Sequence, residues 1–186
     1  MDEFSSAEAA LRAVLDTVEV VDDDDLHRPT PCRDFDVSAL AEHLIDTIIR
    51  LGTAAGIEHQ DTDGQSIAQR ILHVTHTVLA GLRRRGLGGD ITFSGRALPG
   101  RLALGILSLE LAVHGWDFAV ALNRSLDMTD ALAAHILGLA HHTLTAESRV
   151  KAGFDPPLPA PQTASPLDKL VAFTGRDPNL QLPQHP

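Results

Sequence analysis

Apolar side chains recur every three to four residues along most of this chain, a spacing that places them on one face of an α-helix. The pattern predicts five long helices, over residues 5–21, 36–55, 65–85, 100–122 and 129–147. Residues able to accept a hydrogen bond from the first turn of a helix precede them, and the expected N-caps are Ser5 or Ser6, Asp36 or Ser38, and Thr129. Long β-branched or aromatic runs are missing, so the predicted fold class is all-α.

The connections complete the predicted architecture. The glycine-rich stretch 86–100 contains Ile91-Thr92-Phe93, a short strand-like excursion. A proline-rich segment over 153–166 leads into a last short helix at 167–173. We predict an antiparallel four-helix bundle with an extra helix in residues 1–152. A proline-rich arm with the short helix, residues 153–186, is expected to pack on that bundle.

Composition and charge narrow the classes of function. Hydrophobic residues make up 44% of the chain, which is enough for a core, and the formal net charge is −10. That charge argues against a protein that binds nucleic acid through its phosphates. The single basic run, 83–85, is interpreted as a solvated helix end near the negative pole of the helix dipole.

The sequence also predicts a cytoplasmic protein with no membrane partner. The first residues, Met1-Asp2-Glu3-Phe4, do not have the pattern of a secretory signal. No uninterrupted apolar stretch has the length of a membrane span. The one cysteine, Cys32, cannot form an internal disulfide, which fits a reducing compartment. The sequence leaves open whether the protein forms a homodimer.

Three ionisable residues fall on the apolar faces of two predicted helices. His43 lies between Leu40 and Leu44 on the second helix, whereas Glu110 and His114 share the inward face of the fourth. Because Glu110 and His114 are four residues apart, their side chains stack on one helix face and can converge on one atom. An unpaired buried charge is costly, and a divalent cation would remove that cost.

Two imidazoles and one carboxylate, with a coordination position left open, form the ligand set of a catalytic zinc-type site. We therefore predict that His43, Glu110 and His114 bind a divalent metal ion. Zn²⁺ is the leading candidate, and Ni²⁺, Fe²⁺ or Mn²⁺ also suit these ligands. The alternative interpretation is a hydrogen-bonded core histidine beside an ordinary Glu–His pair on a helix surface.

For several other polar residues, the helical pattern leaves two possible roles. His135 and His142 flank the apolar face of the fifth helix, either as a fourth ligand or as partly exposed residues. Asp117 follows His114 by nearly one turn and either orients an imidazole or caps a neighbouring helix. Cys32 is either structural or redox-responsive. Five other histidines are expected at the surface, in loops or in the tail: His27, His59, His73, His76 and His185.

Two motifs give the sequence a family resemblance. The first is Thr30-Pro31-Cys32-Arg33-Asp34-Phe35-Asp36-Val37 followed by Leu40-x-x-His43-Leu44, and the second is Glu110 with His114-Gly115-Trp116-Asp117. With the ending Phe173-Thr174-Gly175-Arg176-Asp177-Pro178, they resemble the DinB-like superfamily. More narrowly, they resemble the metal-binding domain of mycothiol-dependent maleylpyruvate isomerase and its short relatives. Phe35 stands where relatives often carry Trp.

The resemblance implies a four-helix bundle with a long crossover connection and a metal held at the positions of His43, Glu110 and His114. It also implies chemistry with mycothiol or another low-molecular-weight thiol, acting on a small electrophilic substrate. The isomerase has an additional C-terminal domain for which this sequence leaves no room, so maleylpyruvate isomerisation is not carried over. A metal-dependent hydrolase and a non-catalytic metal sensor or binding module stay open as alternatives.

Overall fold

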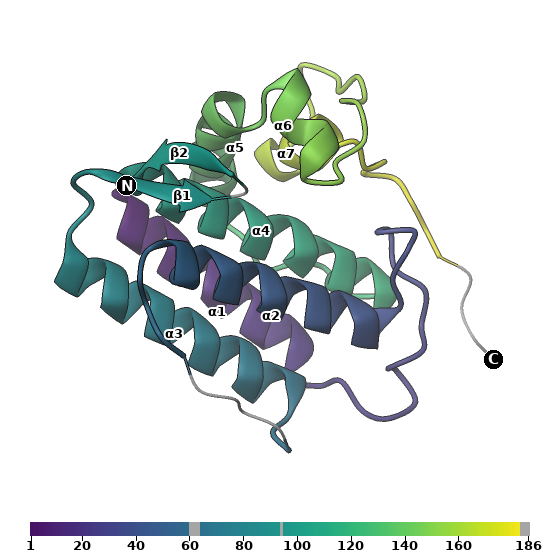
Figure 1. The fold of residues 1–186 in the computed structure, drawn as a ribbon. Helices are drawn as coiled ribbons and strands as arrows, with labels where there is room; N and C mark the ends of the chain where they lie inside the picture. The colour runs from purple at the N-terminus through teal and green to yellow at the C-terminus, as the bar shows by residue number, and fades with distance from the viewer. Residues whose placement is uncertain (60–63, 94, 183–186) are drawn as a thin grey trace.

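The computed structural model describes residues 1–59, 64–93 and 95–182, and it confirms the all-α fold class (Figure 1). The elements in chain order are α1 (Glu3–Val18), α2 (Val37–Ala54), α3 (Ile67–Arg85), β1 (Asp90–Phe93), β2 (Arg96–Pro99), α4 (Gly100–Ala121), α5 (Asp130–Thr143), α6 (Ala146–Lys151) and α7 (Pro166–Phe173). Helices α1 to α4 form the predicted bundle, with α5 and α7 packed beside α4. Residues 183–186, and with them His185, lie outside the described residues.

The sequence predicted an antiparallel bundle, and this prediction is wrong. The bundle is built from two pairs of parallel helices. Arg70 near the start of α3 pairs with Glu42 near the start of α2, so these neighbouring helices run in the same direction. Gly115 near the end of α4 likewise faces Val14 near the end of α1. The parallel order requires a connection after α2 that returns along the bundle, which agrees with the long crossover implied by the resemblance.

Local capping chemistry sets the helix boundaries. The carboxylates of Asp2 and Asp36 accept hydrogen bonds from the first turns of α1 and α2, so the predicted Ser5 or Ser6 cap is wrong and Asp36 is the second cap. Thr129 caps α5 as predicted. The fifth helix was predicted to reach residue 147 but ends at Thr143, because Thr145 and Ser148 form a capping box that starts α6.

The predicted strand-like excursion is one half of a β-hairpin. β1 pairs antiparallel with β2, and Ile91 on β1 is buried opposite Leu98. The hairpin lies beside the end of α2 and the start of α4 (Figure 1). It therefore covers the end of the bundle where α2 stops and α4 begins.

Helix α4 is the central element of the core. By length and composition it is the one helix among the described residues that could cross a membrane. However, 89% of its most apolar 18-residue segment is buried inside the protein. Almost every side chain from Leu107 to Ala121 is buried, including the polar residues Ser108, Glu110, His114 and Asp117. Apolar surroundings favour partners for buried polar groups. Glu110, His114 and Asp117 have such partners, whereas the hydroxyl of Ser108 has none in the described part of the chain.

The C-terminal arm returns α7 to the bundle. The arm residues from Asp155 to Leu158 are exposed, whereas Phe154 is buried and α7 packs against α5 and α4. Buried Arg149 on α6 joins the start of the arm to the end of α7. It donates to the carbonyl oxygens of Asp155 at 3.1 Å and Phe173 at 2.8 Å. The division into a bundle at 1–152 and an arm at 153–186 stays a prediction.

Candidate metal centre

The first candidate ligand, His43, is positioned by the loop that precedes α2. Thr30 is buried and its hydroxyl donates to the carbonyls of Cys32 and Phe35, which closes the loop in front of the Asp36 cap. Phe35 then stacks on His43, with ring centroids 4.8 Å apart and planes at 23°. The Thr-Pro-Cys motif thus orients the imidazole through a local turn and an aromatic contact.

The other two candidate ligands lie on successive turns of α4. His114 Nε2 is 3.2 Å from Glu110 Oε2, and the His114 ring meets the His43 ring edge-on with centroids 5.1 Å apart. The structure therefore brings the three sequence-predicted residues together from α2 and α4. Each offers one ligand atom, and these atoms all lie within 4.8 Å of one another.

This donor set fits a divalent metal ion. Ligands about 2.1 Å from a tetrahedral ion lie about 3.4 Å apart, so a small rotation of the side chains would suffice to bring all three onto one ion. Two neutral imidazoles and a carboxylate are ligands that Zn²⁺ accepts, and three protein ligands leave a position open. Side-chain burial increases from His43, which is partly buried, to His114 with 3% of its side chain exposed.

His114 is held from behind by a buried carboxylate. Its Nδ1 lies 3.0 Å from Asp117 Oδ2, and Arg176 donates to the same carboxylate through Nε at 2.7 Å and Nη2 at 2.8 Å. A carboxylate in an ion pair is only an acceptor, so His114 must donate through Nδ1–H. This leaves Nε2 to face Glu110, the orientation that a metal ligand needs.

The charges of the cluster shift its pKa values in opposite directions. Burial and the nearby charge of His114 lower the pKa of His43. Burial also opposes a proton on His114, but hydrogen bonds to Asp117 and Glu110 outweigh it and raise the pKa of His114. For Asp117 the penalty of burial is overcome by Arg176 and His114, so its pKa is lowered. Without a metal, the cluster therefore favours a proton on His114.

Cys32 lies beside this cluster rather than in a remote part of the core. Its sulfur lies within 4.8 Å of one ligand atom of His114 and one of Asp117. Burial and the negative charge of Asp117 raise the pKa of Cys32 to about 11, so the thiol stays protonated at neutral pH. Cys32 and Arg176 both line a groove of about 750 Å³ between the loop before α2 and the C-terminal segment.

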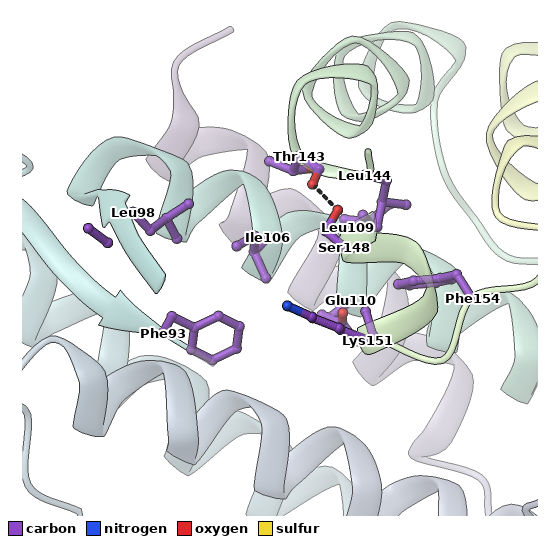
Figure 2. A pocket seen from close by; sticks show the side chains of 12 residues that line it. Phe93, Leu98, Ile106, Leu109, Glu110, Thr143, Leu144, Ser148, Lys151 and Phe154 are labelled. Carbon is purple, nitrogen blue, oxygen red and sulfur yellow. Dashed lines mark hydrogen bonds between the residues drawn. The ribbon is translucent and has the colours of Figure 1, made fainter. Parts of the chain in front are cut away.

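A second, more apolar cavity opens at Glu110. It has a volume of about 400 Å³, and Figure 2 shows Lys151, whose side chain is exposed, beside Glu110 in the lining, with Phe93 across from them. Most of the wall is apolar, with Leu98, Ile106, Leu109, Leu144 and Phe154 from the hairpin, α4 and the segments around α6. Lys151 also pairs with Glu147 at 3.0 Å. The cavity offers an apolar site with an ammonium group, next to one candidate ligand.

The other histidines that the structure describes do not join the cluster. His73 and His76 are exposed, as predicted, and so is His27. His142 is exposed and its Nδ1 contacts the carbonyl of Gly138 one turn earlier, so it is a flank residue of α5. Within the described part of the chain, the candidate ligand clusters contain neither His135 nor His142.

Sequence reasoning missed Arg176, Lys151 and the stacking role of Phe35. Asp117 was a usable signal, because a carboxylate on the inward face of an apolar helix requires a buried cation. Arg176 also stands in the ending motif that carries the family resemblance. The sequence contains 15 Lys and Arg residues and does not say which of them returns to α4. Only the fold identifies Arg176 as this partner.

Comparison with known proteins reaches one of the three candidate ligands, His43. Residues 7–85 match the family model for the mycothiol maleylpyruvate isomerase N-terminal domain, a range that includes His43 but ends before Glu110. Two uncharacterised proteins of Mycobacterium tuberculosis, from strains CDC 1551 / Oshkosh and ATCC 25618 / H37Rv, are each 28% identical over 175 residues. These alignments cover 91% of this chain and 93% of each relative. No solved structure matches significantly. Residues 7–85 are thus similar to the mycothiol maleylpyruvate isomerase N-terminal domain, in agreement with the resemblance drawn from the first sequence motif.

Proposed function

We propose that this protein binds one divalent metal ion through His43, Glu110 and His114 and uses it to transfer a low-molecular-weight thiol to a small electrophile. The observation that carries the metal assignment is the convergence of these three ligand atoms within 4.8 Å, from two helices of an apolar core. Zn²⁺ is the proposed ion. The thiol assignment rests on the family match, with mycothiol as the leading thiol.

The chemistry that the metal would supply is activation of sulfur, since a cation lowers the pKa of a coordinated thiol and favours the nucleophilic thiolate. In the transfer, the S–H bond and a π bond of an unsaturated electrophile break, a sulfur–carbon bond forms, and the thiol proton ends on the neighbouring atom of the adduct. No oxidant or reductant is needed. The half-buried position of His43 leaves that side of the site accessible to a thiol.

The protein's own residues would bind and orient the acceptor. The 400 Å³ cavity at Glu110 is large enough for a small organic molecule and is mainly apolar, which favours a hydrocarbon body. Lys151 adds a positive charge to its lining, which favours an acceptor with one acidic group. We propose a cytoplasmic protein with small-molecule partners, in keeping with its single cysteine.

The test begins with protein purified without an affinity tag and stripped of metal. Zn²⁺ and Co²⁺ are titrated into the wild type and into His43→Gln, Glu110→Gln and His114→Gln, with exposed His73→Gln as the matched control. We expect one ion per chain, a loss of affinity in the three ligand variants and no change in the control. Two or more variants that bind as well as the wild type would refute the site.

The thiol step is tested on the Co²⁺ form. Mycothiol, bacillithiol and glutathione are added in turn, and a thiolate-to-cobalt absorption band is expected for the cognate thiol. The same thiol should then be consumed when a model electrophile is supplied. Metal-dependent ester or amide cleavage without thiol binding would assign the protein to the hydrolases. A retained metal with neither activity would leave a sensor or binding module.

A further inference from the structure

Arg176 connects the C-terminal segment to the candidate metal centre. It follows α7 by three residues, yet its guanidinium reaches Asp117 on α4, 59 positions earlier in the chain. Both N–H···O contacts are short, at 2.7 and 2.8 Å, and the side chains are 10% and 0% exposed. A two-point contact of this kind fixes the carboxylate in both distance and orientation.

The oxygen that Arg176 Nη2 contacts is the oxygen that accepts from His114. Asp117 Oδ2 lies 2.8 Å from Arg176 Nη2 and 3.0 Å from His114 Nδ1. A rotation of the Asp117 carboxylate would therefore break the contact to the imidazole. By blocking that rotation, the guanidinium controls the direction in which His114 presents Nε2.

We propose that Arg176 is a positioning residue of the metal centre, acting on His114 through Asp117. The inference rests on the proposed metal site, because it assigns Arg176 a role in holding one of the ligands. It makes the segment after α7 a functional part of the centre, although none of its residues touches the ion. Such outer partners of a metal-binding histidine typically change metal affinity by about 10–100-fold.

A second buried arginine separates this role from simple attachment of the arm. Arg149 holds the same part of the chain by donating to the carbonyls of Asp155 and Phe173, and it lies over the Phe173 ring at 4.8 Å. No contact joins Arg149 to His43, Glu110, His114 or Asp117 among the interactions found in the described residues. Arg149→Met is therefore a matched control that loosens the arm without disturbing the carboxylate.

The experiment is a double-mutant cycle on Zn²⁺ affinity, measured by chelator competition in the full chain. Arg176→Met and Asp117→Asn should each weaken binding by about 10–100-fold. Adding Arg176→Met to Asp117→Asn should weaken it no further, because the arginine then has no carboxylate through which to act. This double variant also removes both buried charges, which protects it from the instability of a single unpaired charge.

Arg176→Lys separates charge from geometry. An ammonium group keeps the positive charge but cannot hold both carboxylate oxygens in the fork of a guanidinium. We expect intermediate Zn²⁺ affinity and a changed d–d absorption spectrum of the Co²⁺ form, a signature that a general loss of stability would not produce. Arg149→Met should lower the melting temperature while leaving the Zn²⁺ affinity and the Co²⁺ spectrum unchanged.

The outcomes distinguish this inference from the proposed function. If the wild type binds no metal at His43, Glu110 and His114, the metal proposal itself fails. If the wild type binds but folded Arg176→Met binds equally well, only the positioning role is refuted. Equal losses in Arg176→Met and Arg149→Met, or additive losses in the cycle, would also overturn it.

Discussion

The Phe35 ring lies against the His43 imidazole, with 4.8 Å between the centroids and 23° between the planes. The contact links the loop before α2 to a candidate ligand on the second turn of that helix. Because both rings are partly buried, the stack limits the rotation of His43. It gives the motif ending in Phe35 a physical role in the site.

Replacing Phe35 tests this role. An aromatic pair contributes about 0.5–1.5 kcal/mol, so Phe35→Leu should weaken Zn²⁺ binding by about 2- to 10-fold. Phe35→Trp restores a stacking surface and should bind like the wild type. The measurement is a Zn²⁺ competition titration of the three proteins. If Leu and Trp have the same affinity at position 35, the stack has no part in holding His43.

Metal binding should depend on pH through His114. The proton on its Nε2 competes with the ion, and hydrogen bonds to Asp117 and Glu110 raise the pKa of His114 above about 6.5. Affinity should therefore be full above this raised pKa and decrease as the pH falls through it. Zn²⁺ dissociation constants from about pH 5.5 to about pH 8.5 measure the midpoint.

The Asp117→Asn variant provides the control for that profile. It removes one of the two carboxylates that raise the pKa of His114, so the midpoint should move to lower pH. A midpoint that stays in place, or moves upward, would contradict the assignment of the competing proton to His114.

The metal-free protein should lose stability in acid through Asp117. Its pKa is lower in the folded protein than the ordinary value near 3.9, so its contribution is present above that value and is lost as the pH falls through the folded pKa. In Asp117→Asn/Arg176→Met neither charge remains, and this part of the acid dependence should disappear. Urea unfolding of both proteins from about pH 3 to about pH 7 tests it. Parallel curves would exclude Asp117 as the titrating group.

Lys151 should select the charge of the acceptor. Its side chain lines the apolar cavity beside Glu110 (Figure 2). Lys151→Met should reduce kcat/KM for an electrophile with a carboxylate and leave kcat/KM for its neutral ester unchanged. Lys169→Met, a lysine outside the cavity lining, is the matched control. Equal losses for the acid and the ester in Lys151→Met would assign Lys151 a structural role instead.

The sequence predicted the parts of the site that one helix can specify. The spacing of Glu110 and His114 and the inward angle of His43 follow from 3.6 residues per turn, and the structure brings these residues together. Contacts between distant segments of the chain could not be predicted in this way. The parallel pairing of α2 with α3 and the ion pair between Asp117 and Arg176 depend on how distant segments pack. The periodic spacing of apolar residues does not predict that packing.

The break between α5 and α6 shows a local version of the same limit. Apolar spacing continues past Thr143, which favoured one helix as far as residue 147. The capping box of Thr145 and Ser148 competes with that spacing and starts a new helix. The first helix was also misjudged at its start, since Asp2 and Ser5 are both good caps and the structure uses Asp2.

The burial of α4 on all of its faces has a consequence for expression of the family-matching segment by itself. Residues 7–85 provide α1, α2 and α3, which pack around a helix that arrives later in the chain. Produced alone, or while the ribosome is still adding α4, these three helices would expose the apolar side chains that pack against α4, such as Val14, which faces Gly115. Exposed apolar surface of this kind promotes association between chains. A shortened protein ending at residue 85 should accordingly collect in the insoluble fraction, and adding α4 as a separate peptide should return it to solution.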